Sequence, residues 1–197
     1  MTRKSSTGSL RPFTCRAPIG SHASPEAFAS SQTRSGLPLL ISARTECCAA
    51  TLFSDGRTVQ VVNSYRSTLG GWFGGGASTA VFGGPQTRPL LTVGSGGYFA
   101  AGSVPGDEPR AAWQVDGLAE AAVAWVDVEF ADGSRAPATL REGAFLWFVA
   151  RAGVPVPQTR GPVSQEVTEA ALGPLPRVVI AYDSDGAVLE RQPLGHP

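Results

Sequence analysis

The chain has 197 residues, of which 42% are hydrophobic and 16% are charged, which is enough apolar material for one folded domain. Its 24 glycines and 16 prolines predict many turns and few long helices. The formal net charge is zero and Lys4 is the only lysine, so we expect no nucleic-acid partner and exclude a P-loop nucleotide site.

The first 45 residues are rich in Ser, Thr, Pro, Gly and Arg and show no sustained hydrophobic period. We therefore predict that residues 1–45 form a disordered basic leader and that residues 46–197 form a single β-sandwich domain. Basic residues are scattered along this leader, which favours a solvated tail over a segment that binds lipid or nucleic acid. No apolar run approaches the ~20 residues of a membrane-spanning helix, so we expect a soluble chain without a membrane span.

Three segments share one local pattern, in which an Asp-Gly pair separates two apolar runs. Asp and Gly tolerate the positive φ of tight hairpin turns, so each segment is predicted to be a β-hairpin. The hairpins span residues 48–63, 123–140 and 178–190, with turns at Asp55-Gly56, Asp132-Gly133 and Asp185-Gly186. Three hairpins in one chain predict an all-β fold, an antiparallel sandwich or barrel.

The segment between residues 69 and 84 is rich in glycine and contains Trp72. We expect a flexible loop there, leading into a short strand near Ala80. Further short strands are predicted at residues 89–93, 97–101 and 111–115.

The middle hairpin has the clearest pattern. Trp125, Asp127 and Glu129 alternate with apolar residues, so these three side chains share one face of a half-buried strand. Pro137 cannot donate a backbone hydrogen bond, which places the following strand at the edge of a sheet. Residues 144–150 are apolar on both faces, as in a strand that is covered on both sides.

The Pro-rich connection of residues 151–176 contains the only helix candidate, residues 165–172. Ser164 suits the N-cap, and Gly173-Pro174 ends the helix. We expect this short helix to dock on one end of the sandwich.

The aromatic side chains are the leading candidates for a binding site. Trp125 shares its predicted face with Asp127 and Glu129, Trp147 lies on a neighbouring strand, and Trp72 lies in the glycine-rich segment. An exposed aromatic strip bordered by carboxylates suits a sugar ring or a partner segment. The alternative is that the Pro-rich connection or the leader covers this face, so that the tryptophans form a second layer of core.

Catalytic groups are scarce. A serine nucleophile needs a base, and the two histidines, His22 and His196, lie in the leader and at the C-terminus. Asp127 and Glu129 are spaced to act as a carboxylate pair on a glycoside, yet the same spacing occurs on any solvated strand face. We therefore expect no enzyme.

Three cysteines, Cys15, Cys47 and Cys48, fit neither a disulfide framework nor a structural zinc site. We interpret Cys47 and Cys48 as strand thiols, which would point to opposite faces. We expect no cofactor.

Calcium is the one metal for which the sequence offers ligands. Asp183 and Asp185 precede a glycine, as at the start of a calcium loop, but the closing glutamate is absent, and a plain hairpin turn explains the pattern equally well. Asp107, Glu108 and Asp116 are possible additional ligands if the fold brings them together.

Residues 96–191 resemble uncharacterised β-sandwich proteins of high-GC actinobacteria. Three stretches carry the resemblance: A-V-A-W-V-D-V-E-F-A-D-G-S, A-T-L-R-E-G-A-F-L-W-F-V and P-R-V-V-I-A-Y-D-S-D-G-A-V-L. The resemblance implies an Ig-like sandwich and an extracytoplasmic setting at the cell envelope, and it brings no catalytic residues.

We therefore expect a non-enzymatic β-sandwich domain for protein interaction or ligand recognition, with a protein or glycan partner. The alternative is a carbohydrate-active or calcium-dependent sugar-binding domain that uses the carboxylate and aromatic face.

Overall fold

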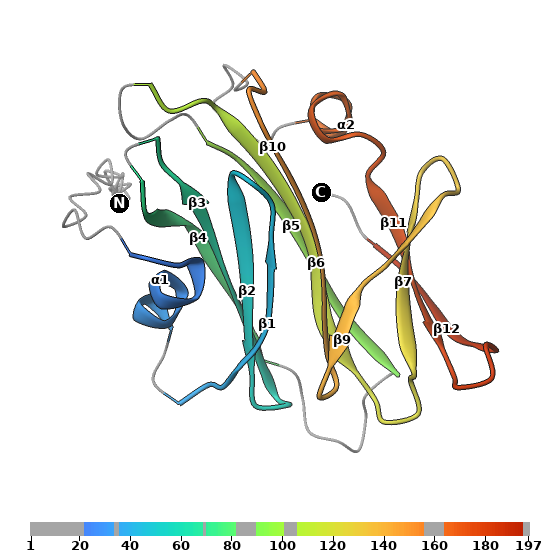
Figure 1. The fold of residues 1–197 in the computed structure, drawn as a ribbon. Helices are drawn as coiled ribbons and strands as arrows, with labels where there is room; N and C mark the ends of the chain where they lie inside the picture. Colours follow the sequence, from blue (N-terminus) through green and yellow to red (C-terminus); the bar gives the residue numbers. More distant parts are fainter. Residues whose placement is uncertain are drawn as a thin grey trace, which may run out of the picture.

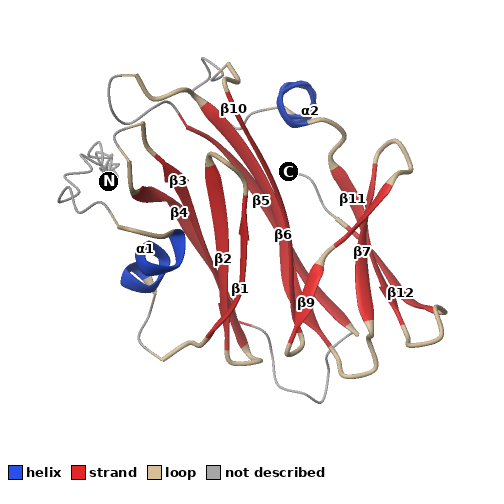
Figure 2. Ribbon diagram, in the orientation of Figure 1, coloured by secondary structure: helices blue, strands red, loops and turns tan. Residues whose placement is uncertain are grey.

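The computed structural model describes residues 22–33, 36–68, 70–81, 90–100, 106–155 and 164–194. These residues form three four-stranded antiparallel sheets, which we name A, B and C, and two short helices (Figures 1 and 2). The all-β antiparallel sandwich predicted from the sequence is therefore confirmed. No helix within these ranges is both long and apolar enough to cross a lipid bilayer.

Sheet A contains the first four strands, each paired with the next one along the chain. They are β1 (Leu39–Arg44), β2 (Cys48–Ser54), β3 (Thr58–Arg66) and β4 (Trp72–Val81). Helix α1 (Pro25–Gln32) begins after Ser24, whose side chain accepts a hydrogen bond from the backbone N–H of Ala27. Ala29 of this helix packs with Phe53 and Val62 on the outer face of sheet A.

Two expectations for this part of the chain were wrong. Helix α1 and strand β1 lie within the segment 1–45 that we expected to be disordered, so residues 22–33 and 36–44 belong to the fold. Residues 1–21 lie outside the described residues. The expected flexible loop is instead part of the ten-residue strand β4, because pairing with β3 along its length outweighs the low strand propensity of its glycines.

Sheets B and C contain the remaining eight strands. Across sheet B the order is β5 (Leu91–Ala100), β6 (Arg110–Ala119), β10 (Ala144–Ala152) and β9 (Thr139–Arg141). Across sheet C the order is β12 (Val188–Pro193), β11 (Pro176–Tyr182), β7 (Trp125–Phe130) and β8 (Arg135–Pro137). Strand β8 ends sheet C, so the prediction that Pro137 lies in an edge strand is confirmed.

All three predicted Asp-Gly hairpins are present. They join β2 to β3, β7 to β8 and β11 to β12. Gly56, Gly133 and Gly186 all have φ between 79° and 88°, the left-handed conformation for which the turns need glycine. The Asp-Gly pair with an apolar run on each side was therefore sufficient to predict six of the strands.

Sheet B is the middle of three layers, with sheet A on one face and sheet C on the other (Figure 1). Leu118 of β6 and Leu146 of β10 pack against sheet A, whereas Val115 and Phe145 pack against sheet C. This explains why β10 is apolar on both faces. Two layers were expected for residues 46–197, but sheets B and C form one sandwich and sheet A, which contains the predicted hairpin of residues 48–63, forms a third layer.

The chain passes between layers B and C at one corner. Residues 135–141 run from the edge strand β8 of sheet C directly into the edge strand β9 of sheet B, with only Ala138 between the two strands. The backbone N–H of Ala138 donates a hydrogen bond to the carbonyl of Val126, which continues the pairing with β7. A second link joins the two layers, since the backbone N–H of Leu91 donates to Glu190 Oε2.

Packing inside sheet B leaves no room at one glycine. A Cβ atom added to Gly117 would lie 1.9 Å from the carbonyl oxygen of Thr92 and 2.9 Å from the ring of Phe145. Strand β6 can therefore fit between β5 and the aromatic ring only if position 117 carries no side chain.

Helix α2 (Gln165–Leu172) has the predicted bounds. The Ser164 side chain accepts from the backbone N–H of Val167, and Gly173 follows the last turn with φ of 92°. Leu172 packs with Ala111 and Val154, so the helix docks on an end of the sandwich as predicted (Figure 1).

A polar network lies in the apolar interface between sheets A and B. Asn63 Nδ2 donates to Gln114 Oε1 at 2.7 Å, and Gln114 Nε2 donates to Asp116 Oδ1 at 3.0 Å. Burial raises the pKa of Asp116 to about 6, although the hydrogen bond from Gln114 partly opposes this change. The carboxyl group therefore lies in surroundings that favour its neutral form.

Candidate functional site

The outer face of sheet C carries a row of three apolar side chains on three adjacent strands. Tyr182 of β11 pairs with Trp125 of β7 on one side and with Val188 of β12 on the other, so the three residues share one face. Trp125 is 39% exposed and Val188 is 50% exposed, whereas Tyr182 between them is buried. We call this set the sheet C row.

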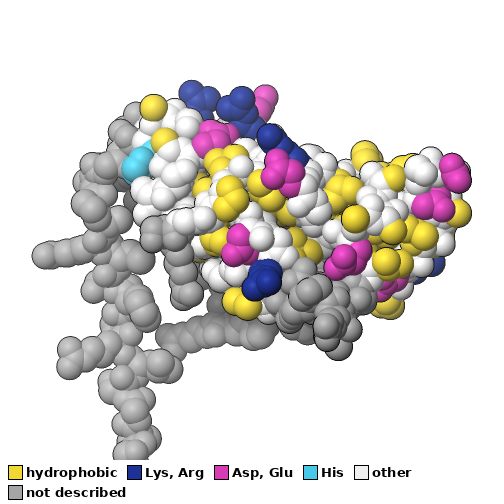
Figure 3. Space-filling model, turned by 90° about the horizontal axis from the view of Figure 1, so that it is seen from below, with side chains coloured by type: hydrophobic (Ala, Val, Ile, Leu, Met, Phe, Trp, Pro, Cys, Tyr) yellow, Lys and Arg dark blue, Asp and Glu magenta, His cyan; other side chains and the backbone are white. Residues whose placement is uncertain are grey.

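Contacts with neighbouring side chains fix the sheet C row. The ring of Trp125 stacks on that of Tyr182, and Arg135 Nη1 donates a hydrogen bond of 3.1 Å to the Tyr182 hydroxyl. Seen from below, hydrophobic side chains lie between acidic ones over the sheet C side of the molecule, at the right of Figure 3. The row is thus a rigid apolar surface with charged surroundings.

Glu129 lies on the same strand as Trp125 and is held by two arginines. Arg135 donates to Glu129 Oε2 and Arg191 donates to Glu129 Oε1, at 2.8 and 2.6 Å. Hydrogen bonding to Glu129 is the main cause that raises the pKa of Arg135. Both carboxylate oxygens are therefore occupied within the sheet, while Asp127 is half-buried on the same strand.

The structure brings together only three of the five predicted binding residues, Trp125, Asp127 and Glu129. Trp147 lies on the opposite side of sheet C, in the space between sheets B and C, where its ring packs edge-on against Phe130. It lines a cavity of about 230 Å³ that helix α2 and residues 174–176 help to close.

Trp72 is separated from these residues as well. It is the first residue of β4 in sheet A, it is buried, and its backbone N–H donates to the carbonyl of His22. The continuous aromatic strip considered from the sequence therefore does not form, and only Trp125 contributes to an exposed face.

Three of the possible calcium ligands, Asp183, Asp107 and Asp116, have other partners. Asp183 Oδ1 accepts hydrogen bonds from the backbone N–H groups of Asp185 and Ala187, which stabilises the hairpin turn. Asp107 accepts from Ser67 and Thr68. Within the part of the chain that the structure describes, no group of three or more His, Cys, Asp or Glu side chains is arranged to hold a metal ion.

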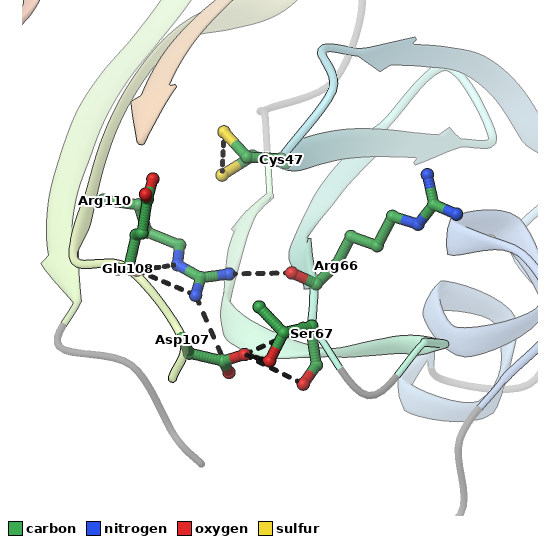
Figure 4. A network of polar contacts seen from close by, with 8 residues as sticks. Cys47, Arg66, Ser67, Asp107, Glu108 and Arg110 are labelled. Carbon is green, nitrogen blue, oxygen red and sulfur yellow. Dashed lines mark hydrogen bonds and ion pairs between the residues drawn. The ribbon is translucent and has the colours of Figure 1, made fainter. Parts of the chain in front are cut away.

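A second site lies at the opposite side of the molecule, in the turn between β1 and β2. Cys47 precedes strand β2 and Cys48 begins it, and their sulfur atoms lie 3.3 Å apart (Figure 4). The expectation that the two thiols would point to opposite faces of a strand was therefore wrong, because Cys47 lies in the turn. Thr45 fixes this turn: its hydroxyl accepts from the backbone N–H of Cys48 and lies 3.6 Å from Cys47 Sγ.

The thiol of Cys48 donates a hydrogen bond to Cys47 and lowers the pKa of Cys47 to about 6. Partial burial opposes this change, while Thr45 and the positive charge of Arg110 add to it. Cys47 is half-buried and lines a cavity of about 260 Å³, which also includes Glu46, Glu108 and the side chain of Arg110.

Arg110 is the anchored cation of this second site. Its guanidinium donates to the carbonyl oxygens of Glu108 and Arg66, forms an ion pair with Asp107, and lies 4.3 Å from the ring centroid of Tyr65. The guanidinium of Arg66 points away from that of Arg110 (Figure 4). Arg110 is 3% exposed, so its position beside the thiols is fixed by the fold.

Comparisons with known proteins returned no matching family model, no matching curated protein and no matching solved structure.

Sequence reasoning missed the partners of both sites. Alternation within one strand placed Trp125 on an outer face, but it did not predict that Tyr182 and Val188 from two other strands would lie beside it. Arg110 gave no signal, since a single arginine before an apolar run is common. The one available signal at the second site was the adjacency of Cys47 and Cys48.

Proposed function

We propose that this chain is a non-enzymatic recognition domain and that the sheet C row of Trp125, Tyr182 and Val188 binds a polypeptide segment. The observation that carries the proposal is the pair of exposed apolar side chains on either side of a buried tyrosine, on three strands held in one register. Exposed aromatic residues on a rigid face are typical of the residues that contribute most to binding.

The row is prepared for binding before a partner arrives. Stacking on Tyr182 restricts the indole of Trp125, and the hydrogen bond from Arg135 restricts Tyr182. Little side-chain entropy is therefore lost when a partner covers the row, and this favours affinity.

The charges around the row favour a basic partner. Asp185 is exposed in the turn beside Val188, and Asp127 lies two residues from Trp125. The nearby cations Arg135 and Arg191 are already paired with Glu129. A segment with an aliphatic or aromatic side chain flanked by Lys or Arg therefore matches this surface best.

The ion pairs of Glu129 support the proposal that the domain is not an enzyme. A glycosidase needs one carboxyl group as acid and one as base or nucleophile, each with access to substrate. Both oxygens of Glu129 are occupied by arginines, and neither of the two cavities described above is lined by Asp127 or Glu129.

Glycan binding is a second candidate, favoured by the stacked geometry of Trp125. An indole held nearly parallel to the ring beneath it presents a flat apolar surface of the kind on which a sugar ring packs. The carboxylate of Asp127 would then accept hydrogen bonds from sugar hydroxyls.

One selection experiment tests the proposal. A random peptide library displayed on phage is selected on the immobilised full-length chain, and the same chain is applied to a glycan array. We expect peptides with a large apolar residue beside Lys or Arg, whose affinity falls at least about tenfold for Val188→Lys, because the variant places a positive charge in the apolar row beside the cations of the peptide.

Val167→Ala is the matched control, since Val167 is also an exposed apolar residue, at 40%, but lies on helix α2. The control should bind the selected peptides as the wild type does. Peptides that bind Val188→Lys and Trp125→Ala unimpaired would refute the proposed site. Glycan binding that is lost in Trp125→Ala, without any selected peptide, would favour the second candidate.

A further inference from the structure

We propose that Cys47 and Cys48 are a peroxide-sensitive pair of thiols, in which a small hydroperoxide oxidises Cys47 to a sulfenic acid and Cys48 then closes a disulfide. This site lies in the turn between β1 and β2 of sheet A, remote from the sheet C row, and the inference does not depend on the proposed function.

The arrangement of the two sulfur atoms carries the inference. They lie 3.3 Å apart, with Cys48 as the hydrogen-bond donor and Cys47 as the acceptor. An acceptor sulfur is the one that carries the thiolate, and the donor sulfur is already positioned for the second step. Thiols that respond to oxidants typically combine thiolate character, access to solvent and a neighbouring cysteine.

The two thiols differ in solvent accessibility, as expected if Cys47 reacts with the peroxide and Cys48 closes the disulfide. Cys47 is half-buried and lines the cavity, whereas Cys48 is fully buried. A hydroperoxide that enters the cavity therefore meets Cys47 first.

Charged groups from every side of the cavity set the reactivity of Cys47. Arg110 supplies positive charge, Glu46 and Glu108 supply negative charge, and the guanidinium of Arg66 points away from Arg110 (Figure 4). Arg110 is the group that is anchored on several partners, and its charge stabilises the thiolate. The thiolate of Cys47 is therefore more populated at neutral pH than that of an ordinary cysteine, which is only a few per cent ionised.

The reaction balances in two steps. In the first, the Cys47 thiolate attacks the terminal oxygen of the hydroperoxide, an S–O bond forms and the O–O bond breaks. The alkoxide takes a proton and leaves as an alcohol, or as water if the oxidant is hydrogen peroxide. Cys47 is oxidised by two electrons to the sulfenic acid and the peroxide is reduced.

In the second step the sulfur of Cys48 attacks the sulfur of Cys47. The S–S bond forms, the S–O bond breaks, and the hydroxide combines with the proton of the Cys48 thiol and leaves as water. Overall, two thiols and one hydroperoxide give one disulfide, one alcohol and one water.

The product disulfide is expected to be easily reduced. Consecutive Cα atoms lie about 3.8 Å apart, which is shorter than the roughly 4.4–6.8 Å range of ordinary disulfides. Strain of this kind makes a disulfide more oxidising and more labile. The pair is therefore suited to reversible oxidation rather than to permanent stabilisation of the turn.

The experiment uses the full chain with Cys15→Ser, so that Cys47 and Cys48 are its only cysteines. The reduced protein is treated with one equivalent of hydrogen peroxide in the presence of dimedone, and then alkylated and analysed by intact-mass and peptide mass spectrometry. We expect a loss of the mass of two hydrogen atoms, protection of both cysteines from alkylation, and complete reversal by dithiothreitol.

Two variants separate the roles of the thiols. Cys48→Ser keeps a hydroxyl donor beside Cys47 but cannot form the disulfide, so dimedone should label Cys47. Cys47→Ser should leave the buried Cys48 unmodified by peroxide. Circular dichroism of both variants checks that the fold is retained.

The third variant tests the hydrogen bond. Cys48→Ala removes the donor, so the midpoint of the pH profile for alkylation of Cys47 by iodoacetamide should lie at least about one pH unit higher than in Cys48→Ser, because the thiolate loses a hydrogen-bond donor. Equal midpoints in the two variants would contradict the assigned donor and acceptor.

Three results would overturn the inference: a dimedone adduct on Cys47 while Cys48 remains a thiol, a disulfide between two chains, or no oxidation at a peroxide concentration that oxidises free glutathione.

Discussion

The indole of Trp125 stacks on the phenol ring of Tyr182, with ring centroids 5.3 Å apart and ring planes inclined by 18°. The two residues belong to neighbouring strands, β7 and β11, and are direct cross-strand partners. The contact therefore depends on the register between the strands, because a shift of one residue would move Tyr182 to the opposite face of the sheet.

Tyr182→Phe tests what the hydroxyl contributes to this arrangement. The variant keeps the ring stack and loses the hydrogen bond from Arg135, so the free energy of unfolding should fall by only about 0.5–1.5 kcal/mol. Tyr182→Ala removes the ring from a buried position and should cost about 3 kcal/mol or more. Urea denaturation measures both values, and equal losses in the two variants would show that the hydroxyl dominates.

Glu129→Gln tests the ion pairs beside the row. The variant removes the charge that faces Arg135 and Arg191 while keeping the size of the side chain. Both arginine side chains are more than 40% exposed, so salt screens these pairs effectively. The melting temperature should fall by a few degrees at low salt, and the difference from wild type should nearly vanish in about 1 M NaCl.

Asp116 makes stability depend on pH. Its pKa is raised to about 6 in the fold, whereas the unfolded chain has the ordinary value near 3.9. Between these values the folded state binds more protons, so the stability that neutral Asp116 contributes is complete below about pH 4. It is lost as the pH rises through about 6, and the total loss is on the order of 2–3 kcal/mol.

Asp116→Asn isolates this effect. The amide oxygen still accepts from Gln114, but the variant has no charge to desolvate at neutral pH. The difference in unfolding free energy between variant and wild type should therefore shift in favour of the variant as the pH is raised from 4 to 7. A difference that is constant over this range would contradict the raised pKa.

Gly117→Ala tests the packing of the middle sheet. The added methyl group would meet the Thr92 carbonyl and the Phe145 ring, so we expect a loss of about 3 kcal/mol or more, or failure to fold. Gly96→Ala on the adjacent strand β5 is the control, since its Cβ would have no atom within 4 Å. Thermal denaturation compares the two, and similar melting temperatures would contradict the packing described here.

The sequence predicted local elements well where the signal was itself local. Asp-Gly turns placed three hairpins, and the Ser164 cap with Gly173 placed helix α2 at its observed bounds. Alternation placed Trp125, Asp127 and Glu129 on one face. Each of these predictions depends on residues that are close together in the chain.

Such local patterns did not predict which strands that are distant in the sequence would pack against each other. Trp125 and Trp147 were expected to lie near each other, yet sheet C separates them, because strands β7 and β10 belong to facing sheets. The short strand expected near Ala80 is the end of β4, but its glycine-rich first part, residues 72–76, was missed because the stability of that part comes from pairing with β3 and not from its own residues. The third layer was missed because β1 lies in a segment whose composition resembles that of a disordered leader.

At Ala138 the chain joins the edge strand β8 of sheet C to the edge strand β9 of sheet B. Without this connection the two edge strands would unpair from their sheets independently. A strand at a margin frays when its last hydrogen bonds break, but here the same few residues close sheet C and sheet B. Because β8 and β9 are joined by a single residue, unpairing of one edge strand displaces the other. The amide protons of β8 and β9 should therefore exchange with solvent through a shared opening event. The corner thereby acts as a seam that keeps the two layers opening together.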